Sequence, residues 1–410
     1  MSESPAVLDL ELGPIAHGGF CVARLQGRVV FVRGGLPGER VRARVIDDSK
    51  ASHWFATATE VLRADDHRVA PPCPVSQRCG GCDFQHVEPA FQRQLKRRVV
   101  SEQLSRGAGI EWDGAVEPAG DDEDGLGWRT RMRYGVQHGR PALRAFRSHD
   151  LVTVPEGGCP ISHPAGRPAA EKAAAGAAQV AVAVAGALTD DPTVGVVADG
   201  HRVEGPSLLV EGLDPRVPLA RAGNRSWKVG ADGFWQVHPR AATVLAEAVI
   251  DGLKPRPGER ALDLYCGVGL FAGLLADAGV RVEGVEVSRA AVGLARRNVP
   301  GARFWAGRTD RIMPRMSHRA DLVVLDPPRK GAGRKVAGQV ASVRPRAIAH
   351  VACDPAALAR DLSLFAENGY RPVSIRAFDL FPMTHHVECV AILRASDDEA
   401  ILRAQDGDGH

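Results

Sequence analysis

Short runs of alternating apolar and polar residues, separated by glycines, occupy the first sixty or so positions of the chain. β-Branched and aromatic residues dominate the runs, and the glycines between them are typical of tight turns. The pattern predicts five strands, over residues 6–12, 20–25, 29–32, 41–46 and 56–62. A small barrel of the OB type, which binds nucleic acid, fits this arrangement, and a purely structural barrel fits it equally well.

The middle of the chain has a different pattern. A basic helix is predicted over residues 89–104. Strands are predicted over residues 128–147, because arginines alternate there with other residues at period two. The alanine-rich tract 169–188 is predicted to be a helix of small side chains with a structural role.

From about residue 228 to residue 394, apolar strands alternate with helical stretches. This order is typical of a doubly wound parallel sheet with helices on both faces. The predicted strands cover residues 260–265, 281–287, 320–325, 347–352, 371–378 and 387–393, and the last two form an antiparallel pair that closes the sheet. The expected fold class is α/β, with predicted domains at 1–66 (β-barrel), 67–227 (central α+β domain) and 228–396 (Rossmann-like domain), and a flexible tail at 397–410.

Composition supports a globular protein of two or three domains. Of the 410 residues, 44% are hydrophobic and 25% are charged, which argues against wholesale disorder and fibrous folds. No apolar stretch has the length of about 20 residues that a membrane span needs, and the N-terminus lacks the pattern of a signal peptide. We therefore expect a cytoplasmic protein with no membrane partner.

The net charge of +3 is too small to identify a polyanionic partner by itself. Between residues 129 and 147, however, there are six arginines and no acidic residue: Arg129, Arg131, Arg133, Arg140, Arg144 and Arg147. This cluster fits a stripe that binds RNA phosphates, and it fits a solvated surface equally well.

Four of the eight cysteines have a spacing that suggests a metal centre. Cys73, Cys79 and Cys82 are close in sequence, and Cys159 follows much later. Disulfides are not expected in the cytosol, whereas three clustered thiols and a distant one can hold a metal. Zinc and a four-iron four-sulfur cluster both remain possible on spacing alone.

A nucleotide-type site is predicted where the first strand of the parallel sheet ends. The strand ALDLYC runs into a turn with Gly267 and Gly269, and the next strand ends at Glu286, whose carboxylate can accept hydrogen bonds from ribose hydroxyls. Gly273 lies one place too late for the dinucleotide fingerprint, so a nucleoside without a pyrophosphate is favoured. S-adenosylmethionine fits this description better than a nicotinamide cofactor, and a structural strand–turn–helix is the alternative.

Three further residues at strand ends are candidates for chemistry. Asp326 is followed by two prolines at the edge where open sheets bind ligands, although a lone Asp is more often a helix cap. Cys353 ends the next strand at the same edge, although a lone cysteine is usually inert packing. Glu388 enters an apolar strand, where a carboxylate with a raised pKa suits a general base and an edge-strand surface residue is the alternative.

Several motifs, in this order, resemble the RNA uridine-C5 methyltransferase family whose members carry an N-terminal TRAM domain and an iron-sulfur cluster. The resemblance spans about residues 6–394. It rests on the four-cysteine pattern and on FWQV from Phe234, DLYCGVGLF from Asp263, LDPPRKG from Leu325, ACDP from Ala352 and FPMTHHVE from Phe381. One departure is His238, where many relatives have asparagine, and it puts one local contact in doubt.

The resemblance implies a Rossmann-like methyltransferase domain, a TRAM barrel and a central iron-sulfur and RNA-binding domain. It implies that Cys353 is the nucleophile and Glu388 the base. Binding of S-adenosylmethionine is implied for Gln236, Tyr265, Glu286 and Asp326. The implied ligands of a [4Fe-4S] cluster are Cys73, Cys79, Cys82 and Cys159.

The expected function is methylation of uridine C5 in a structured RNA, either rRNA or tRNA, by a protein that we expect to be a monomer. Carbon 5 of uracil is a poor nucleophile, so a thiolate must first add to carbon 6, and a base must later remove the proton from carbon 5. Two alternatives are a cytosine-C5 or small-molecule methyltransferase on the same fold and a non-catalytic RNA-binding assembly factor with a structural metal centre.

Overall fold

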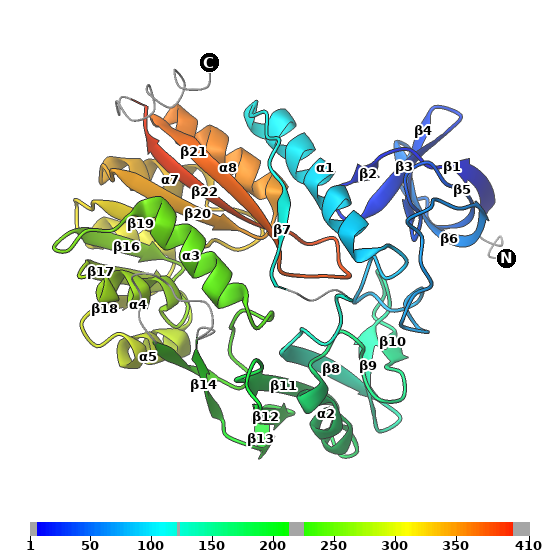
Figure 1. Cartoon of the computed structure of the whole chain (residues 1–410), viewed down its shortest axis with the longest axis horizontal. Coiled ribbons are helices and arrows are strands. Elements are labelled where there is room, and N and C mark those ends of the chain that lie inside the picture. Colours follow the sequence, from blue (N-terminus) through cyan, green and yellow to red (C-terminus); the bar gives the residue numbers. More distant parts are fainter. Residues whose placement is uncertain (1–5, 121–123, 213–224, 397–410) are drawn as a thin grey trace.

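A computed structural model describes residues 6–120, 124–212 and 225–396 of the chain. Three β-sheet units surround a common centre, with the N-terminal barrel, the central sheet and the large mixed sheet each in contact with the other two (Figure 1). Among the described residues, no helix is long and apolar enough to cross a membrane. The predicted tail, 397–410, lies outside the described residues.

The N-terminal unit is a curled six-stranded sheet with the strand order β1-β5-β6-β4-β3-β2. The amide of Gly13 donates to the carbonyl of Val22, which ties the chain after β1 to β3 and curls the sheet on itself. The five predicted strands are all present, and a two-residue strand is added. The strands are β1 (Val7–Glu11), β2 (Ile15–Ala16), β3 (Phe20–Leu25), β4 (Arg28–Arg33), β5 (Arg40–Asp47) and β6 (His53–Arg63).

The central unit is an antiparallel sheet with one short helix and a neighbouring hairpin. The prediction of a helix over 169–188 is wrong for its second half, since the helix ends at Ala174 and residues 179–185 form a central strand. The sequence QVAVAVA alternates β-branched residues, and these pack well between two neighbouring strands. The elements are β8 (Arg131–Gln137), β9 (Arg140–Arg144), β10 (Leu151–Thr153), η1 (Pro164–Gly166), α2 (Arg167–Ala174), β11 (Gln179–Ala185), β12 (Thr193–Ala198) and β13 (His201–Glu204), with the hairpin β14 (Leu208–Gly212) and β15 (Ser226–Gly230).

The large sheet has eight strands in the order β18-β17-β16-β19-β20-β22-β21-β7. β16 to β20 are parallel, whereas β22 runs antiparallel to both β20 and β21, as the sequence predicted for the last two strands. The strands are β7 (Val116–Pro118), β16 (Arg260–Leu264), β17 (Arg281–Glu286), β18 (Arg303–Ala306), β19 (Leu322–Leu325), β20 (Ala347–Ala352), β21 (Tyr370–Asp379) and β22 (Glu388–Ala395). The sequence analysis missed β18, which has only four residues.

Helices cover both faces of this sheet, and each face has its own hydrophobic core. One layer contains α3 (Ala241–Leu253), α4 (Leu270–Asp277) and α5 (Arg289–Asn298). The other contains α1 (Pro89–Ala108), α7 (Gly333–Ser342) and α8 (Pro355–Glu367), with the short helices α6 (Thr309–Ile312) and η2 (Met313–Arg315) nearby. α1 and β7 precede the central unit in the chain, yet α1 packs on α8 and β7 extends the sheet (Figure 1).

Candidate active site

The carboxyl ends of β16 and β17 carry the first residues of a candidate cofactor site. Glu286 ends β17, and its two carboxylate oxygens accept hydrogen bonds from the amides of Gly267 (3.2 Å) and Ser288 (2.8 Å). These bonds fix the carboxylate beside the glycine turn and leave lone pairs for a ligand. Gly267 has a φ of +54°, and a Cβ on it would meet nothing within 4 Å, so the turn borders open space. Its neighbour Tyr265 also has a positive φ of +65°, a strained conformation that is common where side chains line a binding site.

Two more carboxyl groups, of Asp263 and Asp326, lie near Glu286. Asp263 of β16 accepts from the amide of Ala272 at the start of α4, while its other oxygen is buried without a partner among the described residues. Burial raises the pKa of Asp263 to about 8, with smaller contributions from Asp326 and Glu286. Burial, with help from Glu286, likewise raises the pKa of Asp326 to about 7. These carboxyl groups hold their protons more tightly than isolated ones, and a bound cation such as a sulfonium would favour their ionised forms.

Cys353 and Glu388 come together because β20 and β22 are antiparallel neighbours. Ala352, the last residue of β20, pairs with Cys389, so the next pair in this register is Cys353 and Glu388. Cys353 is partly exposed, whereas Glu388 is only 3% exposed. The sequence predicted both residues as reactive groups, and the strand pairing puts them side by side.

Cys353 and Glu388 also interact electrostatically with Asp326. Burial and then Asp326 raise the pKa of Glu388 well above its usual value, while Arg329 opposes the shift. Burial and then Glu388 and Asp326 raise the pKa of Cys353 to about 12. The resting thiol is therefore protonated at neutral pH, and Glu388 is a stronger base than an ordinary carboxylate.

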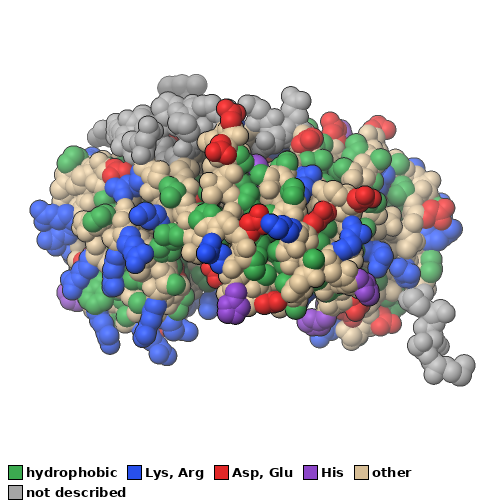
Figure 2. Space-filling view, turned by 90° about the horizontal axis from the view of Figure 1, so that it is seen from below, with side chains coloured by type: hydrophobic (Ala, Val, Ile, Leu, Met, Phe, Trp, Pro, Cys, Tyr) green, Lys and Arg blue, Asp and Glu red, His purple; other side chains and the backbone are tan. Residues whose placement is uncertain are grey.

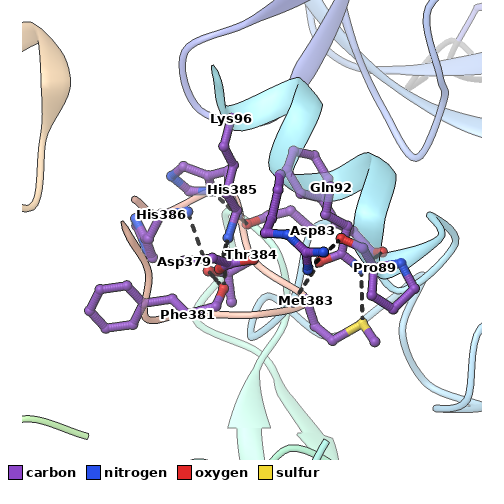
Figure 3. A network of polar contacts seen from close by, with 12 residues as sticks. Asp83, Pro89, Gln92, Lys96, Asp379, Phe381, Met383, Thr384, His385 and His386 are labelled. Atoms are coloured by element: carbon purple, nitrogen blue, oxygen red, sulfur yellow. Dashed lines mark hydrogen bonds and ion pairs between the residues drawn. The ribbon is translucent and has the colours of Figure 1, made fainter. Parts of the chain in front are cut away.

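Residues 380–387, which lead into Glu388, are held from α1 (Figure 3). Gln92 accepts a hydrogen bond from the amide of Met383 at 2.9 Å, while its own amide group donates to the Phe84 and Val87 carbonyls. One turn later, the ammonium of Lys96 lies 2.6 Å from the carboxylate of Asp379 and donates to the Phe381 carbonyl. Both α1 side chains are buried, so the connection between β21 and β22 has a fixed conformation.

Two histidines connect the catalytic strand ends to distant segments. His17, in the turn between β2 and β3 of the barrel, lies 3.1 Å from the carboxylate of Asp354. Asp354 directly follows Cys353, and its side chain caps α8 by accepting from the Ala357 amide. His385 lies 2.5 Å from Asp83, next to Cys82. The barrel and the cysteine segment therefore both contact the loops that carry Cys353 and Glu388.

Gln236 lies in the segment between β15 and α3, which the central sheet holds in place. The carbonyl of the next residue, Val237, accepts from both the amide and the hydroxyl of Thr130. His238 is buried and stacks against Trp128, with ring centroids 5.8 Å apart. Phe234 is 74% exposed on the same segment. The contact between Gln236 and a cofactor stays a prediction.

The four predicted metal ligands line a single cavity of about 470 Å³, together with Arg129 and Trp235. The Sγ atoms of Cys79 and Cys82 accept hydrogen bonds from the Gly81 amide and the Gln85 side chain. Arg33 of the barrel donates to the carbonyls of Gln77, Cys79 and Cys82, which fixes the loop. Over the described residues, however, no three His, Cys, Asp or Glu side chains are arranged to hold a single metal ion.

The arginine stripe predicted from the sequence is wrong at Arg131. Its guanidinium is buried, donates to the carbonyls of Gly230 and Gly233, and pairs with Glu211 at 3.4 Å. Arg129 lines the cysteine cavity, and Arg133, which is exposed, donates to the Asp232 carbonyl. Period-two spacing indicated the strand correctly, but it could not show that the side chains of Arg131 and Arg133 bind the segment before Gln236.

Sequence reasoning also missed several residues of the site, namely Asp263, Arg329, His17, Asp83, Gln92 and Lys96. Asp263 and Arg329 lie inside the DLYC and LDPPRKG motifs, so their motif membership was an available signal. The other four contact the site from segments that are more than 280 residues away in sequence, and nothing local marks them.

Lys and Arg side chains also gather on the outer end of the large sheet (Figure 2).

Comparison with known proteins gives two family matches. Residues 6–59 match the TRAM domain, and residues 308–396 match the tRNA (Uracil-5-)-methyltransferase family. An uncharacterized RNA methyltransferase of Streptomyces avermitilis is 45% identical, and the alignment covers 94% of this chain and 97% of the relative. One from Corynebacterium efficiens is 33% identical, with 94% of each chain covered.

Among solved structures, the fold is similar to that of Pyrococcus abyssi tRNA (uracil-54, C5)-methyltransferase in complex with S-adenosyl-L-homocysteine. The TM-score is 0.70 at 22% identity, and the match covers 94% of this chain and 99% of the other. At this level of identity the likeness concerns the fold.

Proposed function

Because the chain belongs to the family of RNA methyltransferases that combine a TRAM domain with a tRNA (uracil-5-)-methyltransferase domain, we propose that it methylates carbon 5 of a uridine in RNA. The observation that carries the proposal is that Cys353 and Glu388 each adjoin the last pair of β20 and β22, Ala352 and Cys389, and that both interact electrostatically with Asp326. A thiol and a basic carboxylate close together suit a reaction that needs both addition and proton removal.

The residues at these strand ends suit S-adenosylmethionine, which supplies an electrophilic methyl group on a sulfonium. Glu286 is placed to accept hydrogen bonds from the two ribose hydroxyls, as acidic residues at the end of the second strand do in related folds. Asp326 and Asp263 lie near Glu286, and a bound sulfonium would lower their pKa values and favour their ionised forms. Tyr265 and Gln236 complete the proposed set of cofactor-binding residues.

Cys353 begins the reaction as a nucleophile. Its thiol releases a proton to solvent, and the sulfur forms a bond with carbon 6 of uracil while the electrons of the 5,6 double bond move toward carbon 5 and the O4 oxygen. Arg329 is close enough to this chemistry to lower the pKa of both Cys353 and Glu388. It can therefore stabilise the negative charge on the thiolate and then on the ring.

Glu388 completes the reaction as a base. Once carbon 5 carries the methyl group, the carboxylate removes the remaining proton from that carbon. The electron pair of the broken C–H bond restores the 5,6 double bond, and the bond from carbon 6 to Cys353 breaks to release the thiolate. The raised pKa of Glu388 favours this transfer, because a stronger base accepts the proton more readily.

A [4Fe-4S] cluster in the cysteine cavity is part of the proposal. Four thiols around one cavity, without the tight arrangement that a single ion needs, support a larger polynuclear group more than zinc. The hydrogen bonds to Sγ of Cys79 and Cys82 are of the kind that stabilises bound thiolates. Its role here is structural, because the cavity adjoins the segment of Gln236 and the loop of Asp83.

The cluster is tested by metal analysis of anaerobically purified protein, which should be brown and contain iron and sulfide. Cys79→Ser should lose the colour and lower the melting temperature. Cys21→Ser, at a buried cysteine of the barrel, is the matched control and should keep the colour. Stoichiometric zinc without iron would contradict the assignment.

The reaction is tested by trapping. RNA that contains 5-fluorouridine should form a covalent adduct with the wild-type protein and S-adenosylmethionine, because fluorine cannot leave carbon 5 as a proton does. Cys353→Ala should form none, while Cys389→Ala, at the neighbouring buried cysteine, should still form it. An adduct with 5-fluorocytidine RNA alone would instead support a cytosine-C5 methyltransferase.

A further inference from the structure

Four phenylalanine rings cluster at the junction of the barrel and the central sheet. Phe20, Phe31 and Phe55 lie with ring centroids 5.3 to 6.2 Å apart, and Phe146, from the turn after β9, lies 5.9 Å from Phe20. Phe31 and Phe55 are stacked with an interplanar angle of 25°. We call this set, together with Arg147, the aromatic face.

The rings lie on the outer side of the barrel rather than in its core. Val30, Val32, Ala56 and Ala58 alternate with them along β4 and β6 and belong to the barrel core. Phe31 and Phe55 are paired across β4 and β6, so both rings lie on the side of the sheet that faces away from the barrel core. None of the four rings belongs to the hydrophobic core clusters formed by the described residues, and Phe31, Phe55 and Phe146 are partly exposed. Phe20 is buried beneath the other rings, whereas core packing does not account for Phe31, Phe55 and Phe146.

Arginine gives this surface a positive charge. The guanidinium of Arg147 lies 3.5 Å from the centre of the Phe55 ring and within 6 Å of the Phe20 and Phe146 rings. Asp47 lies 3.8 Å from it and helps to hold it there, yet the Arg147 side chain remains 42% exposed. Arg24 lies four residues after Phe20, on the same side of β3, and is also exposed. Aromatic rings combined with guanidinium groups suit a ligand with flat bases and phosphates.

The aromatic face adjoins the candidate active site. Phe20 directly follows the turn 17–19, in which His17 contacts Asp354, and a Cβ on Gly19 would lie 2.9 Å from the Cβ of His385. The turn therefore lies between the rings and two residues near the candidate active site, Asp354 and His385. An RNA strand that delivers one base to Cys353 has its neighbouring nucleotides within reach of this surface.

We infer that the aromatic face stacks unpaired bases of single-stranded RNA next to the target nucleotide. The identity of the target nucleotide rests on the proposed function, whereas the stacking of bases does not. Arg147 contacts a phosphate or stacks on a base, and Phe31 offers its ring at the exposed edge. Every base has a π face, so this surface selects unpaired RNA over duplex RNA without reading its sequence. The barrel thereby contributes strand selection rather than catalysis.

Binding of fluorescein-labelled oligouridylate of 12 nucleotides, compared with a 12-base-pair RNA duplex, tests this inference. Wild-type protein should bind the single strand more tightly. The double variant Phe31→Leu/Phe55→Leu keeps apolar bulk but cannot stack, and its affinity for the single strand should fall roughly 5- to 150-fold. Phe31→Tyr/Phe55→Tyr is the matched control, which keeps both rings and should bind like wild type. Melting curves of all three proteins verify their folding.

Arg147→Ala should reduce the slope of log affinity against log salt by about 0.7, the value for one phosphate contact to a single strand. Equal affinities of the Leu and wild-type proteins for oligouridylate would overturn the inference, whatever the result of the 5-fluorouridine experiment. Conversely, loss of binding in the Leu variant without any 5-fluorouridine adduct in wild type would leave the stacking surface intact and contradict only the proposed reaction.

Discussion

Glu388 and Asp326 illustrate how neighbouring acids acquire different roles. Each lies in a poorly solvated position near the other, so both cannot ionise as easily as isolated carboxylates. The pair holds a proton more tightly than an exposed acid does. A base of this strength suits the removal of a proton from carbon, and this step occurs after the methyl group has been transferred.

Replacing Glu388 with glutamine should therefore stop the reaction late. The amide keeps the size of the side chain but cannot accept the proton, so a methylated covalent complex between protein and RNA should accumulate. Radiolabelled S-adenosylmethionine and a denaturing gel would detect label that migrates with both. Glu367→Gln, at an exposed glutamate of α8, is the control and should turn over normally. Normal turnover of Glu388→Gln would assign the base to another group.

The pH dependence of Cys353 follows from the direction of its shift. Burial and the neighbouring carboxylates raise its pKa to about 12, so the thiolate fraction should rise about tenfold per pH unit between pH 7 and 10. The rate of iodoacetamide labelling of the Cys353 peptide, measured by mass spectrometry, should rise accordingly without a plateau. In Glu388→Gln one source of negative charge is gone, so the curve should shift to lower pH. A plateau near pH 8.5 in the wild-type protein would mean an unperturbed thiol.

At the scale of elements, the connection between β21 and β22 depends on α1. Lys96 and Asp379 are both buried, and the charge of each side chain is balanced by the opposite charge of the other. Lys96→Met should leave an unpaired buried carboxylate and lower the free energy of unfolding by about 3–5 kcal/mol. Because Glu388 follows this connection, the rate of adduct formation should fall as well.

Chemical denaturation of three variants checks this expectation. Arg98→Met, at an exposed position of the same helix, should change stability little. The double variant Lys96→Met/Asp379→Asn removes both charges and should recover part of the loss. A Lys96→Met protein as stable as wild type would show that the ion pair does not fix the connection.

The elements also show which sequence signals were sufficient. Three strands of the large sheet, which lead to Glu286, Asp326 and Cys353, were predicted because apolar runs are followed there by polar motifs. The tract 169–188 was misjudged because alanine favours helices while the alternating valines favour a strand, and pairing with β8 and β12 decided in favour of the strand. The role of α1 as a cover for the large sheet has no local signal at all, since it depends on contacts between distant segments.

At the scale of the whole molecule, three units contribute to one site. The large sheet carries the proposed cofactor-binding residues together with Cys353 and Glu388, the central unit holds the segment of Gln236, and the barrel reaches Asp354 through His17. The sequence predicted the candidate catalytic residues from motifs, but it could not show that Arg131 has a structural role or that the barrel contacts the residue after Cys353. Both facts arise from chain segments that meet only in the folded protein.

The central claim is that this chain methylates uridine C5 in RNA through Cys353. The most direct test is mass spectrometry of nucleosides in the RNA of cells that lack the gene, complemented with the wild-type or the Cys353→Ala protein. The account predicts that 5-methyluridine at one or more sites disappears with the gene, returns with the wild-type protein and does not return with Cys353→Ala. Unchanged 5-methyluridine in all strains, or loss of a different methylated nucleoside, would contradict it.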